Sequence, residues 1–275
     1  GIWGFSLFKT NMMWTRYLDR LKNQKGLIIV SAQKKQGIYH ISGLRDPLAE
    51  DPLNLLQKEE EKRIKITTHW RPFYSLDPEF VLQRARKLLK PPSTIKLELS
   101  GSSILARGKA SQDWIETFQK TALTIPGIDG FKEGLIQNID KEKLNSTVKG
   151  LMAIKIYFEN NSTNLVKEQE QILTQIYQKI KAIQMLQFKL KDPLRVVITG
   201  HTDSSGTEKF NLKLSRNRAE NIFNYLIGRG INSTFLTISG VGDKKPLKKE
   251  NDTNDRQYNR AVSFDTFYPL SAKGS

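Results

Sequence analysis

The sequence predicts an α+β fold in which helices alternate with strands along both halves of the chain. Apolar residues recur at spacings of three and four in several segments, which indicates amphipathic helices. Between these segments, short apolar runs either alternate with polar residues or continue unbroken, as expected for strands buried on one face or on both. The 275 residues, 38% of them apolar and none of them cysteine, are enough for two cores without disulfides or thiolate metal sites.

The first predicted domain covers residues 1–62 and consists of a helix followed by two strands. The apolar stripe of the helix ends near Gly26, and residues 27–32 and 38–44 then have the composition of strands. The charged run at 58–62 is expected to be a solvated loop or a helix end. The stripe is formed by Trp14, Tyr17, Leu18 and Leu21.

The second predicted domain covers residues 63–140 and begins with an alternating segment at 63–70. Its main elements follow in the order helix, strand, strand, helix, strand. Asp77 and Pro78 stand where an N-cap and the first helical residue belong, and Pro91 stops that helix. The later elements are a hairpin over 94–101 and 104–110, a helix around 114–122 and a strand at 131–136.

A polar segment at 141–150 lacks apolar periodicity and is expected to be a linker to a third domain over 151–275. That domain should begin with a strand at 151–158, followed by a long helix. Residues 195–200 form a continuous apolar run, as expected for a strand buried on both faces. A second helix and two further strands complete a βαβαββ order with a mixed sheet. The helical stripes comprise Leu165, Ile172, Ile176, Ile180 and Ile183, then Leu214, Ile222, Leu226 and Ile227.

The formal net charge of +16 is spread along the chain. Residues 1–150 hold 25 basic and 16 acidic residues, net +9, and residues 151–275 hold 19 basic and 12 acidic residues, net +7. A basic surface attracts any polyanion, so nucleic acid, an anionic membrane face and an acidic cell-wall polymer all stay open as partners. The sequence has no run of 18 apolar residues, so no membrane-spanning helix is expected within it.

Asp203 and Arg218 are the candidate binding pair. Asp203 closely follows the strand at 195–200, and Arg218 lies early in the next helix, at the edge of its apolar stripe. An acid at a strand end and an arginine at a helix start can meet across one cleft, where the acid accepts from an ammonium and the arginine holds a carboxylate. A structural salt bridge between the two side chains, without a ligand, is the alternative.

The string GHTDSSGTEKFNLKLSRNRA at 200–219 resembles the peptidoglycan-binding motif of OmpA-like domains, the module of OmpA porins, Pal lipoproteins and MotB stator proteins. IYFENNSTNL resembles the opening strand and loop of that family, and NDRQYNRAV resembles its closing signature, so the resemblance covers roughly 151–268. It implies that Asp203 binds the free ammonium and carboxylate end of diaminopimelate in the stem peptide, and that Arg218 grips its carboxylate.

The same resemblance implies further residues at the site. Asn211 falls on the asparagine of the motif, whose side chain supports the loop or the ligand. Thr202 and Asn161 match loop positions that line the same cleft. Arg256 and Arg260 lie on the closing signature, which flanks the site.

Two points limit the resemblance. Where the family usually has a second consecutive arginine in its closing signature, this sequence has Ala261, so any contact from that position is lost. The predicted domain at 63–140 more loosely resembles BON domains, small modules of bacterial envelope proteins, and 1–62 resembles a partial second copy.

Together these observations predict a non-catalytic anchor that binds peptidoglycan and tethers a membrane component of a Gram-negative envelope to the cell wall. The expected location is the periplasm, with attachment to the outer rather than the inner membrane through a region outside this sequence. His40, His69 and His201 are isolated, so no metal site is expected, and no cofactor motif is present. The alternatives are a basic module that binds nucleic acid or anionic lipid, and a wall-anchored component of a stator or secretion machine.

Overall fold

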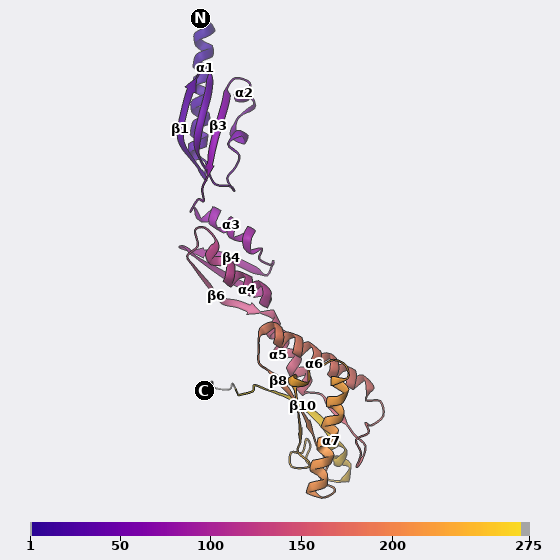
Figure 1. The fold of residues 1–275 in the computed structure, drawn as a ribbon. Coiled ribbons are helices and arrows are strands. Elements are labelled where there is room, and N and C mark those ends of the chain that lie inside the picture. The colour runs from indigo at the N-terminus through magenta and orange to yellow at the C-terminus, as the bar shows by residue number, and fades with distance from the viewer. Residues whose placement is uncertain (1, 271–275) are drawn as a thin grey trace. The chain divides into compact units, whose positions relative to one another are not determined.

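The computed structural model describes the backbone of residues 2–270 and the side chains of residues 7–270. It divides into an N-terminal unit that ends at Gln137 and a C-terminal unit that begins at Asn138 (Figure 1). Within the described residues, no helix combines the length and the hydropathy needed to cross a membrane.

The N-terminal unit contains two three-stranded sheets, in the orders β1-β2-β3 and β4-β5-β6. Each sheet belongs to a set of elements in the same order, helix, strand, strand, helix, strand. The elements are α1 (Ile2–Asn23), β1 (Leu27–Lys35), β2 (Ile38–Arg45), η1 (Pro52–Leu55), α2 (Lys58–Glu61), β3 (Lys65–Pro72), α3 (Pro78–Leu89), β4 (Ile95–Ser100), β5 (Ser103–Ala110), α4 (Gln112–Thr121), η2 (Ala122–Thr124) and β6 (Gly130–Asn138).

The predicted boundary between residues 62 and 63 is wrong, because the alternating segment there joins the first sheet. Strand β3 pairs in parallel with β2, from Ile38 opposite Lys65 onward. A parallel neighbour needs a crossover, and residues 46–64 supply it. The alternation then directs Ile66 and Trp70 toward the core of the first sheet.

The charged run at 58–62 is not fully solvated, contrary to prediction. Glu60 is buried, because its carboxylate accepts a hydrogen bond from the N–H of Gln57 at 2.9 Å and pairs with the guanidinium of Arg20. Glu60 is therefore a structural acid within this otherwise charged and exposed segment.

Helix α3 belongs to both cores of the N-terminal unit. Phe80 packs in the first core and Val81 in the second. At the same junction Arg84 donates from Nη2 to Oδ2 of the fully buried Asp46 at 2.7 Å and from Nη1 to the carbonyl of Pro126 at 2.6 Å. The predicted start of α3 is confirmed, because the Asp77 side chain accepts from the N–H of Glu79 and Pro78 is the first helical residue.

In the C-terminal unit, the segment predicted as a linker at 141–150 is helix α5 (Ile139–Met152). The side chain of Asn138 caps its first turn. Leu144 and Leu151 are buried in the core of the unit. Val148 packs against the same core between them, so the helix contributes a stripe of three residues whose helical spacing the sequence analysis missed among their polar neighbours.

A four-stranded mixed sheet in the order β7-β10-β8-β9 forms the centre of this unit. Strand β10 is antiparallel to β7 and β8, and β8 is parallel to β9. The predicted βαβαββ order and mixed sheet are confirmed. The elements are β7 (Lys155–Tyr157), α6 (Glu170–Leu190), β8 (Arg195–Gly200), α7 (Glu208–Ile227), η3 (Ser233–Phe235), β9 (Leu236–Gly240), η4 (Thr253–Asn259) and β10 (Ala261–Phe267).

Two predicted elements are shorter than expected. The strand expected at 151–158 is limited to β7, because α5 extends to Met152. The long helix begins only at Glu170, and Leu165, expected on its stripe, instead forms a β-bridge with Phe158.

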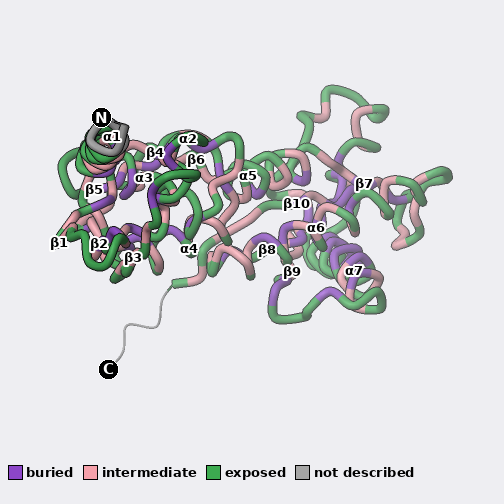
Figure 2. The backbone as a smooth tube through the Cα atoms, turned by 90° about the horizontal axis from the view of Figure 1, so that it is seen from above, coloured by how far each residue is buried: buried purple, intermediate pink, exposed green. Residues whose placement is uncertain are grey.

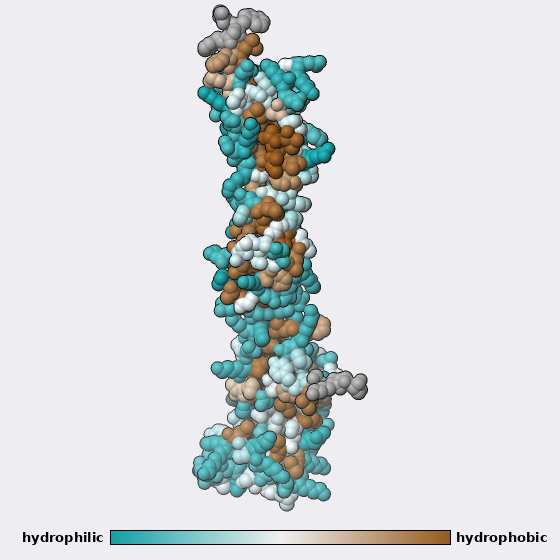
Figure 3. Space-filling model, turned by 90° about the vertical axis from the view of Figure 1, so that its left-hand side faces the viewer, coloured by the Kyte–Doolittle hydropathy of each residue, from teal (hydrophilic) through white to brown (hydrophobic). Residues whose placement is uncertain are grey.

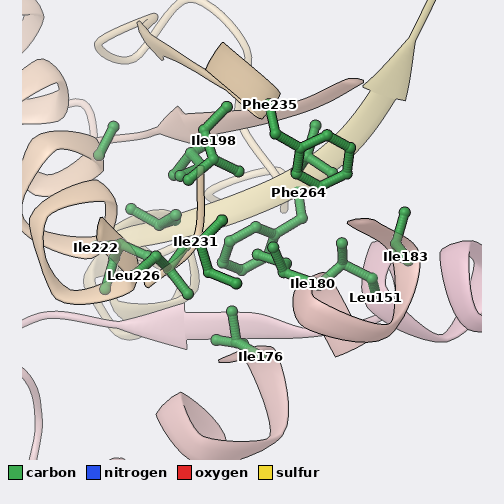
Figure 4. Close-up of a cluster of buried hydrophobic side chains, with 14 of the residues drawn as sticks. Leu151, Ile176, Ile180, Ile183, Ile198, Ile222, Leu226, Ile231, Phe235 and Phe264 are labelled. Atoms are coloured by element: carbon green, nitrogen blue, oxygen red, sulfur yellow. The ribbon is translucent and has the colours of Figure 1, made fainter. Parts of the chain in front are cut away.

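The core of the C-terminal unit lies between the sheet and helices α6 and α7. Figure 4 shows side chains from these helices, including Ile180 and Ile222, meeting Ile198 and Phe264 of the sheet. The same interior appears in purple in Figure 2. On β8, Val196 and Ile198 are fully buried while Val197 is only half-buried, so the prediction of burial on both faces is wrong.

Candidate functional site

The backbone of the site is set by close contact between helix α7 and the ends of two strands. A Cβ atom on Gly200 would lie 1.8 Å from the carbonyl oxygen of Ser215, and one on Gly240 would lie 2.5 Å from the amide nitrogen of Arg216. Only glycine permits this approach. The turn that follows β8 is thereby held next to the N-terminal half of α7.

Asp203 lies in this turn and is only 4% exposed. Its Oδ1 accepts hydrogen bonds from the N–H and the hydroxyl of Ser205, the first at 3.0 Å. Its Oδ2 has no hydrogen bond within the described part of the chain and lies 3.7 Å from Nη1 of Arg260. One carboxylate oxygen is therefore committed to the turn, and the other remains available as an acceptor.

Three candidate residues each carry a buried polar atom that has no hydrogen-bond partner among the described residues. They are Thr202 (Oγ1), Asn211 (Oδ1) and Arg260 (Nε). Asn211 is connected to the backbone of Asp203, because its Nδ2 donates to the carbonyl of Asp203 at 3.4 Å. Buried polar groups are normally satisfied, so these unpaired atoms indicate a missing partner, which is either water or a ligand.

Arg218 is fully buried, and its guanidinium is committed to the backbone. Nε donates to the carbonyl of Ser162 at 2.9 Å, Nη1 to that of His201 at 2.9 Å, and Nη2 to that of Glu159 at 3.0 Å. Its cationic carbon lies 5.3 Å from the centroid of the Phe158 ring. Burial lowers the pKa of Arg218 to about 10, against the opposing effect of the Asp203 carboxylate.

The alternative of a ligand-free salt bridge between Asp203 and Arg218 is absent among the described residues, because the Arg218 guanidinium donates to three carbonyls instead. The cation next to Asp203 is Arg260, which lies on the closing signature. The clamp on a ligand and the roles of Thr202 and Asn211 in binding stay predictions. The other two predicted residues, Asn161 and Arg256, have no hydrogen bond or ion pair to Asp203 among the described residues.

Asn161 is exposed and has a left-handed φ of 47° in the loop that Arg218 holds through residues 159 and 162. Arg256 lies 3.7 Å from the carboxylate of Glu250 and is 40% exposed at its side chain. Asn161 thus belongs to the rim of the site. Arg256 supports a neighbouring loop.

Glu250 is a functional candidate that the sequence did not indicate. Its carboxylate accepts from the N–H of Ser204 at 3.2 Å, from the hydroxyl of Ser204 and from Nδ2 of Asn259 at 2.9 Å. Burial opposes ionisation of Glu250, but these hydrogen bonds outweigh it and lower its pKa. Because Glu250 lies 47 residues after Asp203 in a basic loop, no spacing pattern connects the two in the sequence.

Both ring nitrogens of His201 have partners within the protein. Nδ1 pairs with the carbonyl of Lys245 at 2.9 Å and Nε2 with the hydroxyl of Ser263 at 2.8 Å. Burial lowers the pKa of His201, so it stays neutral near pH 7. Within residues 2–270 no three histidine, aspartate or glutamate side chains are grouped closely enough to hold a metal ion.

A hollow of about 230 Å³ opens beside Arg260. Its lining includes Tyr258, Gln257 and Val166 as well as Arg260. The site thus combines a recessed acid with a partly exposed arginine that also lines this hollow. An acid and an arginine a few ångströms apart suit a ligand that carries an ammonium and a carboxylate on the same end.

Comparisons with known proteins find a family match within the C-terminal unit and several similar proteins. Residues 157–260 match the OmpA family model. The chain is 26% identical to outer membrane protein A of Bordetella avium over 198 residues, which are 64% of this chain and 97% of that protein. It is 29% identical to peptidoglycan-binding protein ArfA of Mycobacterium tuberculosis over 121 residues, 44% of this chain, and spans about a third (35%) of that protein. The solved structure of the peptidoglycan-associated lipoprotein of Burkholderia pseudomallei matches with a TM-score of 0.36 and 24% identity, over 41% of this chain and 89% of that chain.

Proposed function

We propose that the OmpA-like domain at residues 157–260 binds peptidoglycan, without catalysis, through the free end of a diamino acid in the stem peptide. One observation carries this proposal. Asp203 is nearly buried, yet its Oδ2 has no hydrogen bond within the described residues and lies 3.7 Å from Nη1 of Arg260, and Thr202, Asn211 and Arg260 each carry a buried polar atom without a partner.

The donors and acceptors among these atoms indicate which ligand fits the site. Oδ2 of Asp203 accepts from an ammonium, and the oxygens of Thr202 and Asn211 are additional acceptors. The N–H of Arg260 is a donor for a carboxylate. The side chain of diaminopimelate ends in both groups, so it matches acceptors and donor together.

The alternative is a purely structural cleft in which water satisfies the unpaired atoms. Ordered water commonly fills such sites. This structural interpretation predicts that removing the charge of Asp203 leaves binding to cell-wall material unchanged. The two interpretations therefore differ in one measurement.

That measurement is cosedimentation of the full chain with purified sacculi that contain diaminopimelate. Asp203→Asn keeps the shape of the side chain and removes its charge, and the exposed Glu220→Gln is the matched control on α7. Because a hydrogen bond to a charged group contributes about 1.5–3 kcal/mol, affinity should fall about tenfold or more for the first variant. Equal pelleting of both variants, with unchanged melting temperatures, contradicts the proposal.

The net charge of +16 favours a second candidate, a module that binds nucleic acid or anionic lipid through its basic surface. Binding of that kind falls steeply with salt because it releases counterions. Repeating the sacculus assay between about 50 and 200 mM salt distinguishes the two, since charge-driven binding loses several orders of magnitude over that range and is insensitive to Asp203→Asn.

We further propose that the chain acts in the periplasm and that its N-terminal unit attaches this anchor to a membrane component. The first half of α1 exposes Leu7, Phe8 and Met12, and Figure 3 shows apolar surface where the described side chains of α1 begin. Flotation with anionic phospholipid vesicles tests this. Phe8→Gln should reduce flotation, whereas Phe188→Gln, which removes an even more exposed phenylalanine from the C-terminal unit, should not.

A further inference from the structure

Two strongly exposed apolar side chains lie next to each other near the end of helix α6. Phe188 is 82% exposed and Met185 is 63% exposed. They are three residues apart, so they share one face of the helix. Exposed apolar side chains that adjoin one another, unlike scattered ones, commonly mark an interaction surface.

A groove of about 450 Å³ opens beside these two side chains. Besides Met185 and Phe188, its lining includes Leu194 and Phe235, which are buried members of the core of the C-terminal unit. Pro269 also lines the groove. The groove is therefore apolar from its exposed wall down to the core.

The groove is preformed, because helix α6 is tied to the turn that leads into η3. Oε1 of Gln184 accepts a hydrogen bond from the N–H of Asn232 at 2.9 Å. Oδ1 of Asn232 in turn accepts from the N–H of Thr234 at 2.9 Å. All three residues line the groove. Because these bonds already hold its shape, little conformational freedom is lost when a partner enters.

Positive charge adjoins the groove. Arg195 lines it and is exposed, and among residues 7–270 its guanidinium has no hydrogen bond or ion pair. Lys181 is also exposed and lies one helical turn before Met185, on the same face. The carboxylate of Asp192 is already used, because it accepts from the N–H of Leu194 at 3.0 Å. This face is therefore complementary to a partner that brings negative charge.

Charge and shape distinguish between the partners that could cover this face. A second copy of the chain would bring like charges together, which is unfavourable at an interface. A bilayer surface covers protruding side chains but does not fill a hollow that reaches Leu194 and Phe235. A protein segment with a projecting apolar side chain and neighbouring acids both fills the hollow and pairs with Arg195.

We propose that this groove docks an acidic segment of another protein, which inserts an apolar anchor beside Phe188 and places a carboxylate on Arg195. The groove and the proposed wall site lie at opposite ends of β8, because Arg195 begins that strand and Gly200 ends it just before the Asp203 turn. A strand of this length spans about 17 Å, so the two sites do not overlap. The domain can then hold a protein partner and the cell wall at the same time.

The test uses peptides selected on the full chain from a displayed library of random sequences. Enriched peptides are synthesised with a fluorophore, and fluorescence anisotropy measures their affinity for the parent, Phe188→Gln and Arg195→Glu at physiological salt. Phe210→Gln is the control for an exposed phenylalanine elsewhere in the unit, and Lys213→Glu is the control for an exposed cation. Each peptide is also made with its acids replaced by lysine.

We expect the enriched peptides to combine acidic residues with an aromatic or aliphatic anchor. Phe188→Gln should weaken their binding about tenfold or more, because a few anchoring contacts dominate an interface. Arg195→Glu should weaken the acidic peptide by a similar factor and strengthen binding of its lysine version, because the charges of the pair are exchanged. The two control variants should change affinity less than about threefold.

Four results overturn the proposal. Enriched peptides that bind Phe188→Gln as tightly as the parent dock elsewhere, and binding that Arg195→Glu leaves unchanged excludes an acidic partner. A lower molar mass of Phe188→Gln than of the parent in solution assigns the face to a second copy. Reduced flotation of Phe188→Gln with anionic vesicles assigns it to lipid.

The same variant separates this inference from the proposed function. Phe188→Gln changes an exposed side chain, so it should fold, and it should pellet with sacculi as the parent does. Loss of peptide binding with unchanged pelleting therefore places the two activities at different sites.

Discussion

Replacing Gly200 by alanine tests whether the close contact between β8 and α7 builds the site. The new Cβ would lie 1.8 Å from the carbonyl oxygen of Ser215 and 2.6 Å from its carbonyl carbon. Both are backbone atoms of a helix, so no side chain can rotate away. Helix α7 must retreat from the strand, or β8 must bend.

The geometry sets the size of the effect. Ordinary contact begins near 3.4 Å, so the two backbones must separate by about 1.6 Å, the difference from 1.8 Å. A radial gap of 0.5–1 Å already forfeits a quarter to a half of the attraction between packed atoms. Overpacking of a core typically costs about 1–3 kcal/mol, and a backbone clash of this depth belongs at the upper end, about 2–3 kcal/mol.

Hydrogen exchange of the β8 and α7 amides measures this cost. A loss of 2–3 kcal/mol corresponds to a fall in protection of roughly 30- to 150-fold, since 1.4 kcal/mol is a factor of ten. Every tryptophan of the sequence (Trp3, Trp14, Trp70 and Trp114) lies in the N-terminal unit, so the unfolding transition seen by tryptophan fluorescence should not move.

Gly228→Ala is the matched control in the same unit. Gly228 has a right-handed helical φ of −59°, and the nearest neighbour of a new Cβ is the carbonyl oxygen of Asn224 at 3.3 Å. Its protection should change little. If Gly200→Ala loses no more protection than Gly228→Ala, the packing argument for the position of the Asp203 turn is refuted.

Three further predictions concern stability. Burial lowers the pKa of His201 below the unfolded value of 6.5, so the unfolded state takes up the proton first as pH falls. The stability of the C-terminal unit should therefore be full above about pH 6.5 and decline below it. His201→Gln should flatten that dependence of stability on pH in calorimetric scans. Arg84→Met leaves Asp46 as an uncompensated buried acid, so the urea midpoint seen by tryptophan fluorescence should fall by the equivalent of about 3 kcal/mol, whereas the exposed Arg86→Met should leave it in place. Gly150→Ala in α5 meets only the flexible end of Lys179, so it should raise the stability of the C-terminal unit by up to about 1 kcal/mol in the same scans, and a loss would contradict the assignment of α5 as a helix.

The C-terminal order of elements could be predicted because each element carries its own periodic signal. The stripe through Ile176, Ile180 and Ile183 and the run at 195–200 reflect burial in the core that the structure contains. Helix α5 had a weaker signal, because only Leu144, Val148 and Leu151 face that core among polar residues that are largely exposed. Its start depends on the single cap at Asn138.

In the N-terminal unit, the local sequence pattern could not predict which strands pair with each other. The segment at 63–70 was correctly predicted to alternate, but alternation is equally compatible with either neighbouring sheet. The parallel register of β3 against β2 is a long-range choice, made by the crossover through residues 46–64. The BON resemblance of this unit stays a prediction.

The site residues show a different limit of prediction from the sequence. The sequence grouped Asp203, Thr202 and Asn211 as candidates, because all three follow one strand in a short stretch, and their role in binding stays a prediction. It missed the pairing of Asp203 with Arg260 and the support of Ser204 by Glu250, because both partners arrive from residues 250–260 after another strand has intervened. Contacts of that kind depend on the sheet order, which places β10 beside β8.

A motif specifies the type of a residue, whereas its role depends on which of its atoms remain free after folding. Arg218 and Arg260 illustrate the difference, since both are arginines of the predicted site. The guanidinium of Arg218 donates to three carbonyls, each of which would be costly to leave unpaired in a buried site. Arg260 is partly exposed, and its Nη1 lies 3.7 Å from the carboxylate of Asp203. The fold thus gives one residue type two different environments, and only the packing of the loop after β7 against the turn after β8 determines which arginine holds the backbone.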